Sequence, residues 1–181
     1  MSKSKKAVLG VTASIAAYKS ADIIRRLQDK GFRVSVVMTP EAEKFITALT
    51  LASLSGEKVH REMFDDNDQS WQMSHITLAH EADILLIAPA TANVIGKIAN
   101  GIADDLLTCI AMATKAPILI APAMNDDMFN NQIVQNNISK LKKIGVHFAD
   151  PIKGKLACGT TGEGHLADVE EIVKSAVQLA K

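Results

Sequence analysis

Apolar and polar residues alternate in blocks along this chain, and the blocks predict strands and helices in turn. Continuous apolar runs predict buried strands, and apolar residues at three- and four-residue spacing predict amphipathic helices between them. We expect strands at 6–12, 32–38, 83–88, 116–121 and 146–149. We expect helices at 15–30, from residue 40, at 47–54, within 92–114, at 127–143 and at 168–181, with loops at 65–70 and 150–166.

The alternation of strand and helix determines the predicted fold class. Strands separated by single helices form a parallel sheet with right-handed crossovers, so the chain is expected to be α/β, with helix layers on both sides of a central sheet. Its 181 residues show no internal repeat and no linker, which predicts a single domain spanning 1–181. In such sheets ligands bind at the carboxyl ends of the strands.

Composition excludes several classes of protein. Hydrophobic residues make up 48% and charged residues 22%, which is typical of a globular chain. A formal net charge of zero argues against a nucleic-acid partner, and the longest apolar runs are too short for a membrane span. The two cysteines, Cys109 and Cys158, form neither a disulfide framework nor a metal-ligand pattern, so we expect no metal and a reducing, cytoplasmic location.

Polar and small side chains follow the first two predicted strands. Ser14 and Ile15 begin the helix after the first strand, where a hydroxyl and free N–H groups suit one phosphate group. The dinucleotide fingerprint of three spaced glycines is absent from this turn. Thr39 follows the second strand and is a second candidate for phosphate. Each of these residues is equally consistent with a helix N-cap.

The next two strand ends carry a different set of groups. Small side chains leave room for a flat ring, while hydroxyl and amide groups can bind its polar edge. Asn125 can donate to a carboxylate without adding charge, which suits decarboxylation because a full positive charge would stabilise the ground state. Helix capping explains the Thr and Asn residues equally well. The candidates are Thr91, Ala92, Asn93, Ala123 and Asn125.

Two further residues are candidates for proton transfer. Cys158 lies among four glycines in the predicted loop at 150–166, which is typical of a mobile flap that closes over a substrate. The alternative is a flexible surface loop with an incidental thiol. His75 precedes the third strand, and a neutral imidazole can act as a base, although a lone histidine is more often structural. Cys109 is expected in the core of an apolar helix.

Together these segments resemble the homo-oligomeric flavin-containing cysteine decarboxylase family. The resemblance runs from Gly10 to Leu166. It departs from the family at Phe129, where tryptophan is frequent, and at His165-Leu166, where arginine-methionine is frequent. The motifs that carry it are Ser-Ile-Ala-Ala at 14–17, Ser-His-Ile at 74–76, Pro-Ala-Thr-Ala-Asn at 89–93, Ala-Asp-Asp-Leu-Leu-Thr at 103–108, Pro-Ala-Met-Asn-Asp-Asp-Met at 122–128 and Ala-Cys-Gly at 157–159.

The resemblance implies a Rossmann-like flavoprotein domain that binds FMN at the strand ends, near a subunit interface of a homotrimer or of a homododecamer built from trimers. It implies a lyase that decarboxylates 4'-phosphopantothenoylcysteine to 4'-phosphopantetheine in coenzyme A biosynthesis, through thioaldehyde and enethiol intermediates. His75 matches the family's acid/base for oxidation, Asn125 the residue that holds the carboxylate, and Cys158 the thiol that protonates the enethiol. The segment 150–166 matches the substrate flap.

Other readings remain open. A peptidyl-cysteine decarboxylase shares the oxidation step but stops at the enethiol, so Cys158 favours the coenzyme A reaction. A flavin prenyltransferase would lack the Met-Asn motif and the cysteine loop. A non-catalytic, flavin-binding regulatory subunit need not retain His75 or Cys158. The sequence leaves open whether the chain stands alone or is joined to a coenzyme A synthetase domain, as in bifunctional relatives.

Overall fold

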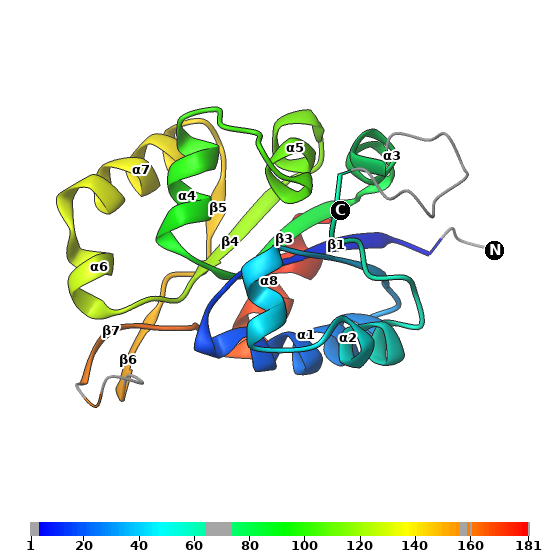
Figure 1. Cartoon of the computed structure of the whole chain (residues 1–181), viewed down its shortest axis with the longest axis horizontal. Helices are drawn as coiled ribbons and strands as arrows, with labels where there is room; N and C mark the ends of the chain where they lie inside the picture. The colour runs from blue at the N-terminus through cyan, green and yellow to red at the C-terminus, as the bar shows by residue number, and fades with distance from the viewer. Residues whose placement is uncertain (1–3, 64–73, 156–158, 160, 181) are drawn as a thin grey trace.

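A five-stranded parallel sheet forms the centre of the protein, for which we describe a computed structural model (Figure 1). The structure describes residues 4–63, 74–155, 159 and 161–180. The strands lie in the order β2-β1-β3-β4-β5, and each hydrogen-bonded pair is parallel. This arrangement confirms the predicted α/β fold and its five strands. Their bounds are β1 (Lys6–Val11), β2 (Arg33–Met38), β3 (Ile84–Ala90), β4 (Ile118–Pro122) and β5 (His147–Phe148).

Helices cover both faces of the sheet (Figure 1). One face packs against α1 (Ser20–Asp29), α2 (Ala48–Ser55) and α8 (Val169–Leu179). The other packs against α3 (Ser74–Glu81), α4 (Ala92–Ala99), α5 (Leu106–Ala113) and α7 (Gln132–Lys143). Three shorter pieces, η1 (Ile15–Lys19), η2 (Pro40–Lys44) and α6 (Asp126–Asn130), follow the ends of β1, β2 and β4.

Alternation along β1 shows why two separate cores form. Successive side chains of a strand point to opposite faces, so Leu9 and Val11 pack towards α1 and α8 while Val8 packs towards α5. Gly10 shares the α5 face, where a Cβ would lie 2.5 Å from Cδ1 of Leu107. The leucine therefore occupies the space that a larger residue at position 10 would need.

Two predicted helices are interrupted. The helix expected at 15–30 divides into η1, a 3₁₀ turn, and α1, and the Ser20 hydroxyl donates a 2.6 Å hydrogen bond to the Ala17 carbonyl at the junction. The helix expected at 127–143 divides into α6 and α7 at Asn131, whose extended backbone and side chain cap α7. The Asn131 cap therefore ends α6 and starts α7, although the apolar pattern in the sequence continues across both helices.

The prediction of a loop at 150–166 is wrong in part. Two antiparallel strands, β6 (Ile152–Lys155) and β7 (Thr161–His165), form a hairpin beside the carboxyl edge of the sheet (Figure 1). Glycines at 154, 162 and 164 give the segment little strand propensity, so tertiary packing determines its form. Helix α3 was also not predicted. The loop expected at 65–70 lies outside the described residues.

None of the helices in the described part of the chain has the length and apolar character needed to cross a membrane.

Candidate functional site

The carboxyl ends of the parallel strands bring most predicted site residues to one edge. Ser14, Thr39, Thr91 and Ala123 each lie within three residues of a strand end on the four adjacent strands. In the order β2-β1-β3-β4-β5, the connection after β1 leads to β2 and the connection after β3 leads the opposite way to β4, which opens a crevice between the loops after β1 and β3. The sequence-based placement of the site at this edge agrees with that topology.

Hydrogen bonds join these strand ends into a continuous ledge. The Thr39 N–H donates to the Val11 carbonyl (3.1 Å), and the Ala123 N–H donates to the Ala90 carbonyl (3.0 Å). These bonds extend the sheet pairing by one residue beyond β2 and β4. The loops after β1, β2, β3 and β4 therefore keep a fixed spacing, which a preformed ligand site requires.

Thr12 is a residue of this ledge that sequence reasoning missed. Its side chain is buried, and its hydroxyl donates to the Pro89 carbonyl (2.8 Å) while accepting from the Thr91 N–H (3.1 Å). It thus ties the turn after β1 to the turn after β3, at the crevice itself. No local pattern marks this role, because its partners lie almost eighty residues away along the chain.

The candidate phosphate and ring residues are partly used as helix caps. The Ser14 hydroxyl accepts from the Ala16 N–H (3.3 Å) at the start of η1, and the Thr91 hydroxyl accepts from the Val94 N–H (3.4 Å) at the start of α4. Thr39 precedes η2 and makes no side-chain capping bond. Ala92 is half-buried and Asn93 is exposed. The capping alternative is therefore correct for Ser14 and Thr91. The helices that they cap, η1 and α4, still begin at the carboxyl edge of the sheet.

Asn125 has a defined amide orientation. Its Oδ1 accepts from the N–H groups of Asp127 (3.0 Å) and Met128 (3.3 Å), which caps α6. Its Nδ2 donates to Oδ1 of Asp126 (3.1 Å). With the oxygen committed to α6, the side chain faces its other surroundings through amide N–H donors, the groups that a carboxylate accepts from.

The β6–β7 hairpin is bonded to the same strand end. The Met124 N–H donates to the Gly164 carbonyl (3.0 Å), so β7 runs beside the segment that holds Asn125. Cys158 lies outside the described residues, between β6 and β7 in the sequence. Its predicted role, and that of the segment 150–166 as a flap, stay predictions.

His75 lies apart from the other candidates within one chain. It is the second residue of α3, and its Nδ1 is buried with no hydrogen-bond partner among the described residues. Figure 1 places α3 and the β6–β7 hairpin at opposite ends of the molecule. A single chain therefore does not bring His75 to Asn125. A buried imidazole nitrogen without a partner is costly, so this atom calls for a ligand or another chain.

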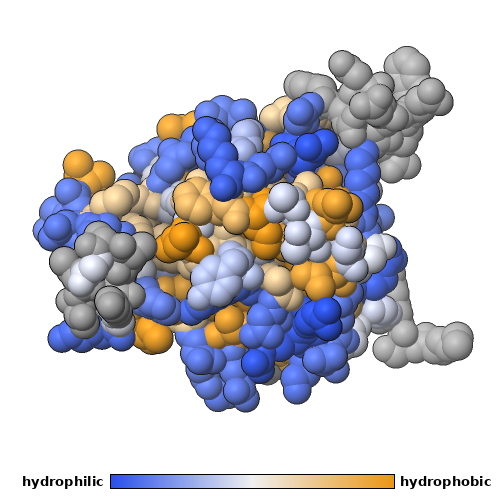
Figure 2. Space-filling view, turned by 60° about the horizontal axis from the view of Figure 1, so that its bottom comes forward, coloured by the Kyte–Doolittle hydropathy of each residue, from blue (hydrophilic) through white to orange (hydrophobic). Residues whose placement is uncertain are grey.

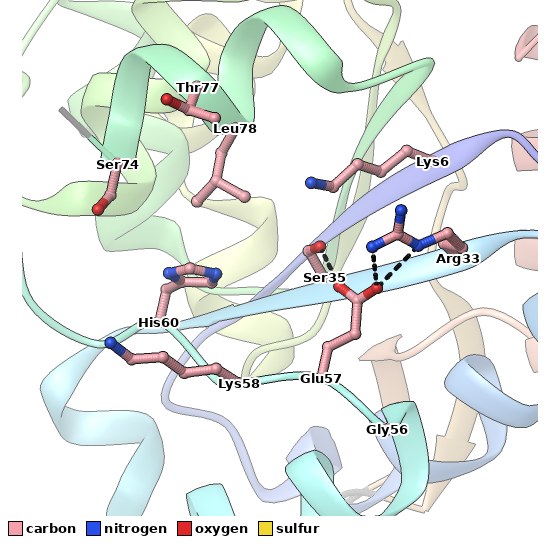
Figure 3. A pocket seen from close by; sticks show the side chains of 10 residues that line it. All are labelled: Lys6, Arg33, Ser35, Gly56, Glu57, Lys58, His60, Ser74, Thr77 and Leu78. Carbon is pink, nitrogen blue, oxygen red and sulfur yellow. Dashed lines mark hydrogen bonds and ion pairs between the residues drawn. The ribbon is translucent and has the colours of Figure 1, made fainter. Parts of the chain in front are cut away.

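A cavity of about 470 Å³ lies beside α3, away from the strand-end ledge. Figure 3 shows Glu57 on its wall between Arg33 and Ser35, which donate to it at 2.8 and 2.6 Å. Burial alone would raise the pKa of Glu57, but the bonds from Ser35 and Arg33 outweigh it and the pKa is lowered. Lys6 also faces the cavity and pairs with Glu81 (2.6 Å). The cavity contains none of the predicted site residues, and these ion pairs explain its polar lining.

The Ala-Asp-Asp-Leu-Leu-Thr motif at 103–108 forms the start of α5. The Asp105 carboxylate accepts from the Thr108 N–H (2.8 Å), and the Thr108 hydroxyl contacts the Asp105 N–H (3.2 Å) in a reciprocal capping box. Lys97 pairs with Asp104 (2.8 Å) and Asp105 (3.0 Å). The motif therefore has a structural explanation in helix capping. Cys109, on the next turn, is half-buried rather than in the core.

The whole chain, residues 1–181, matches the family model described as Flavoprotein. The chain belongs to the Flavoprotein family. Membership confirms the resemblance predicted from the motifs, and it makes the strand-end ledge the place to test for a flavin.

Relatives and solved structures narrow the comparison within the Flavoprotein family. The chain is 43% identical over 169 residues to the coenzyme A biosynthesis bifunctional protein CoaBC of Vibrio vulnificus, covering 93% of this chain and 42% of that protein. The chain thus spans less than half the length of this curated relative. It is 43% identical over 172 residues to a probable phosphopantothenoylcysteine decarboxylase of Streptococcus mutans, covering 94% of this chain and 96% of that protein.

Among solved structures, a PPC decarboxylase mutant complexed with pantothenoylaminoethenethiol superposes with a TM-score of 0.85 at 32% identity, covering 97% of this chain and 98% of that chain. The FMN-dependent cysteine decarboxylase SpaF superposes with a TM-score of 0.84 at 29% identity, covering 97% of both chains. Both likenesses extend over the sheet, the helices and the hairpin, which confirms the Rossmann-like single-domain fold.

The residues at the ledge fit a flavin mononucleotide. Small side chains at 90, 92 and 123 leave the ends of β3 and β4 open to a flat ring, and the starts of η1 and η2 direct N–H groups to the edge. The ledge candidates include no charged side chain, which suits a neutral ring system whose contacts are hydrogen bonds.

Proposed function

We propose that the chain is an FMN-dependent decarboxylase that converts 4'-phosphopantothenoylcysteine to 4'-phosphopantetheine in coenzyme A biosynthesis. The observation that carries the proposal is the ledge, where the Asn125 oxygen caps α6 and its amide nitrogen donates to Asp126 beside the ends of β3 and β4. Similarity over almost the full length of the decarboxylase from Streptococcus mutans supports the same reaction. Where a synthetase domain is joined to the decarboxylase, as in the longer bifunctional relatives, that domain is the expected partner.

In this proposal the ledge holds the cofactor. Ser14, Ile15 and Thr39 bind the FMN phosphate at the starts of η1 and η2, because helix starts present N–H groups and positive dipole ends. The ring lies against the loops after β3 and β4. When bound, FMN would supply a two-electron acceptor for oxidation of the cysteine side chain to a thioaldehyde and would return the two electrons to the substrate after CO2 leaves. The ring contacts are Thr91, Ala92, Asn93 and Ala123.

Each catalytic residue has a different role in the reaction. Asn125 orients the carboxylate through neutral N–H donors, so the carboxylate is held without a cation that would oppose loss of CO2. His75 exchanges a proton with the cysteine moiety during oxidation. Cys158 donates the proton that, together with a hydride that the reduced cofactor would return, converts the enethiol to the saturated thiol. Thiol chemistry of this kind needs a reducing compartment, in agreement with a cytoplasmic location.

The separation of His75 from Asn125 within one chain leads us to infer a homo-oligomer, a trimer or a dodecamer of trimers, in which one chain's His75 reaches its neighbour's ledge. Exposed apolar side chains on η1 and α2 support this, because a monomer gains nothing from them. Ile15 is 62% exposed and Leu49 is 76% exposed. Figure 2 shows apolar atoms gathered over the middle of one face, bordered by hydrophilic residues.

Mixing of inactive variants tests the shared site. His75→Asn and Asn125→Ala chains should each lack turnover, and refolding them together should restore activity in about a quarter of the sites if each site takes its two residues from different chains. Native mass spectrometry gives the assembly size. A monomeric, active protein would contradict the oligomer.

Turnover by the FMN-loaded protein tests the function itself. Adding 4'-phosphopantothenoylcysteine should release CO2 and give 4'-phosphopantetheine by mass spectrometry. His75→Asn should block flavin reduction by substrate, whereas His80→Asn, an exposed position of the same helix, should not. Cys158→Ala should release CO2 but leave a product lacking two hydrogens. Normal product from Cys158→Ala would remove its proton-donor role.

A peptidyl-cysteine decarboxylase is the second candidate, because the peptidyl-cysteine decarboxylase EpiD superposes with a TM-score of 0.80 at 27% identity. The higher identity to the Streptococcus mutans relative favours the small-molecule substrate. Turnover of a cysteine-terminated peptide, without turnover of 4'-phosphopantothenoylcysteine, would reverse this preference. A flavin-loaded protein that turns over neither compound would instead be a regulatory subunit.

A further inference from the structure

Asp126 lies between the Asn125 amide and the β6–β7 hairpin. Its Oδ1 accepts a 3.1 Å hydrogen bond from Nδ2 of Asn125. Its other carboxylate oxygen lies against Gly162 on β7, where a Cβ would overlap Oδ2 and would come within 2.6 Å of both Cβ and Cγ of Asp126. One carboxylate therefore contacts the amide on one side and the backbone of the hairpin on the other.

Position 162 requires glycine because no space is left for a Cβ atom, and not because of its backbone conformation. The glycines with positive φ include Gly56 and Gly159, but not Gly162 or Gly164. Alanine could therefore adopt the backbone conformation at 162, and what excludes it is the Asp126 side chain. Gly164 differs, because its Cβ would overlap the Met124 carbonyl oxygen, a backbone atom. The hairpin thus contacts the segment after β4 at two places, the side chain of Asp126 and the main chain of Met124.

The same contacts determine which way the Asn125 amide faces. Flipping the amide would place its oxygen against the Asp126 carboxylate and its NH2 group against the N–H groups of Asp127 and Met128. Both ends of the amide therefore disfavour the flip. With Asp126 removed, the bond from Nδ2 to its carboxylate would no longer oppose the flip.

We propose that Asp126 is a positioning residue that holds the Asn125 amide ready for a carboxylate, and that Gly162 on β7 keeps Asp126 in place. The proposal rests on the assignment of Asn125 to the substrate carboxylate. Through these contacts the position of the hairpin is coupled to the orientation of the amide that binds the substrate. Asp126 acts through Asn125 and does not itself take part in the chemistry.

Carboxylate-specific binding is the first test, on the FMN-loaded protein. Asp126→Ala should raise KM for 4'-phosphopantothenoylcysteine about tenfold, the loss expected when a donor to a charged group is misplaced. Binding of 4'-phosphopantetheine, which lacks the carboxylate, should stay within about twofold, and the FMN spectrum should not change. Asp126→Asn, which keeps an acceptor oxygen, should recover most of the loss. Equal weakening of both ligands, or no recovery with asparagine, would overturn the proposal.

A double-mutant cycle of unfolding is the second test and does not depend on activity. Gly162→Ala should destabilise the wild-type protein and should cost less in the Asp126→Ala background, where the overlapping Oδ2 and Cγ are gone and only the Cβ of residue 126 stays within 2.6 Å. Gly164→Ala is the matched control, and its effect should be the same in both backgrounds because it meets a main-chain oxygen. Additive effects of positions 126 and 162 would overturn the coupling.

The two tests separate the inference from the proposed function. If the wild-type protein has no turnover with the substrate, the proposed function fails while the unfolding cycle still decides the contact between positions 126 and 162. A crystal structure of the Asp126→Ala protein would then show whether the Asn125 amide has turned. If the wild-type protein turns over normally and Asp126→Ala does too, the positioning role alone is wrong.

Discussion

The Thr12 hydroxyl donates a 2.8 Å hydrogen bond to the Pro89 carbonyl, across the crevice between the turns after β1 and β3. It also accepts from the Thr91 N–H at 3.1 Å, so one buried hydroxyl satisfies a donor and an acceptor of the opposite turn. Because the proposed flavin site lies between these turns, the bond determines the spacing of the groups that would hold the phosphate and the ring.

Thr12→Val should separate the two turns. Valine has the same shape but leaves the Thr91 N–H without this acceptor and the Pro89 carbonyl without its hydroxyl donor, a loss of about 1–3 kcal/mol in the free energy of unfolding. We expect FMN affinity to fall as well, because both side-chain bonds between the two halves of its site are lost and the longer bond from the Thr12 N–H to the Pro89 carbonyl (3.3 Å) remains. Urea unfolding and fluorescence titration with FMN measure both effects. Thr12→Ser keeps the hydroxyl, and a comparable loss of affinity in that variant would contradict the explanation.

The strands were predictable from sequence because β3 and β1 are continuous apolar runs with burial on both faces. The position of the site followed from the same pattern, since parallel strands end at a common edge. The partner of Thr12 was not predictable, because no local signal connects it with Pro89. Nor could the sequence show that β7 is a strand, since its Gly-Glu-Gly segment pairs only because it packs on Asp126.

His75 illustrates a different limit. Its motif identified it as a candidate, but the sequence could not place α3 relative to Asn125. The structure shows them apart within one chain and leaves Nδ1 of His75 buried without a partner among the described residues. Joining two candidates into one site therefore depends on assembly, which neither periodicity nor motif spacing specifies.

Gly10→Ala should destabilise the protein through Leu107. The added Cβ would lie 2.5 Å from Cδ1 and 3.0 Å from Cδ2 of this leucine, so the side chain must move within a packed core, at a cost of about 1–3 kcal/mol. In the Leu107→Ala background the same change should cost much less. Chemical denaturation of the four proteins gives the coupling energy. Gly96→Ala, in α4 with only Asn137 at 3.6 Å, is the control and should stabilise by about 0.5–1 kcal/mol.

The stability of the fold should depend on the ionisation of Asp105. Burial alone would raise the pKa of this carboxyl, but bonds from the Thr108 N–H, Lys97 and the Thr108 hydroxyl outweigh burial and lower it. A lowered folded pKa gives stability that is complete above the unfolded value of about 3.9 and is lost as pH falls through the folded value.

Asp105→Asn isolates this charge, because asparagine can still cap α5. At pH 7 the variant should be less stable by about 1 kcal/mol, since Lys97 loses one of its two partners. The difference should shrink as pH falls from about 4, where the carboxyl of the unfolded chain begins to take up its proton, through the lower pKa of the folded protein. Urea unfolding between pH 7 and pH 3 measures the trend. A difference that stays constant across this range would show that the charge does not contribute.

Cys109 should react slowly with thiol reagents. Burial raises the pKa of its thiol, and the carboxylates of Asp105 and Asp104 raise it further, so little thiolate forms near neutral pH. Its Sγ also lies 3.2 Å from the Ala103 carbonyl, to which the thiol donates. In the Cys158→Ala protein, where Cys109 is the remaining cysteine, reaction with a disulfide reagent at pH 8 should be at least about fivefold slower than for free cysteine. Asp105→Asn in that background should speed the reaction, because it removes one negative charge beside the sulfur, and an unchanged rate would show that burial alone protects the thiol.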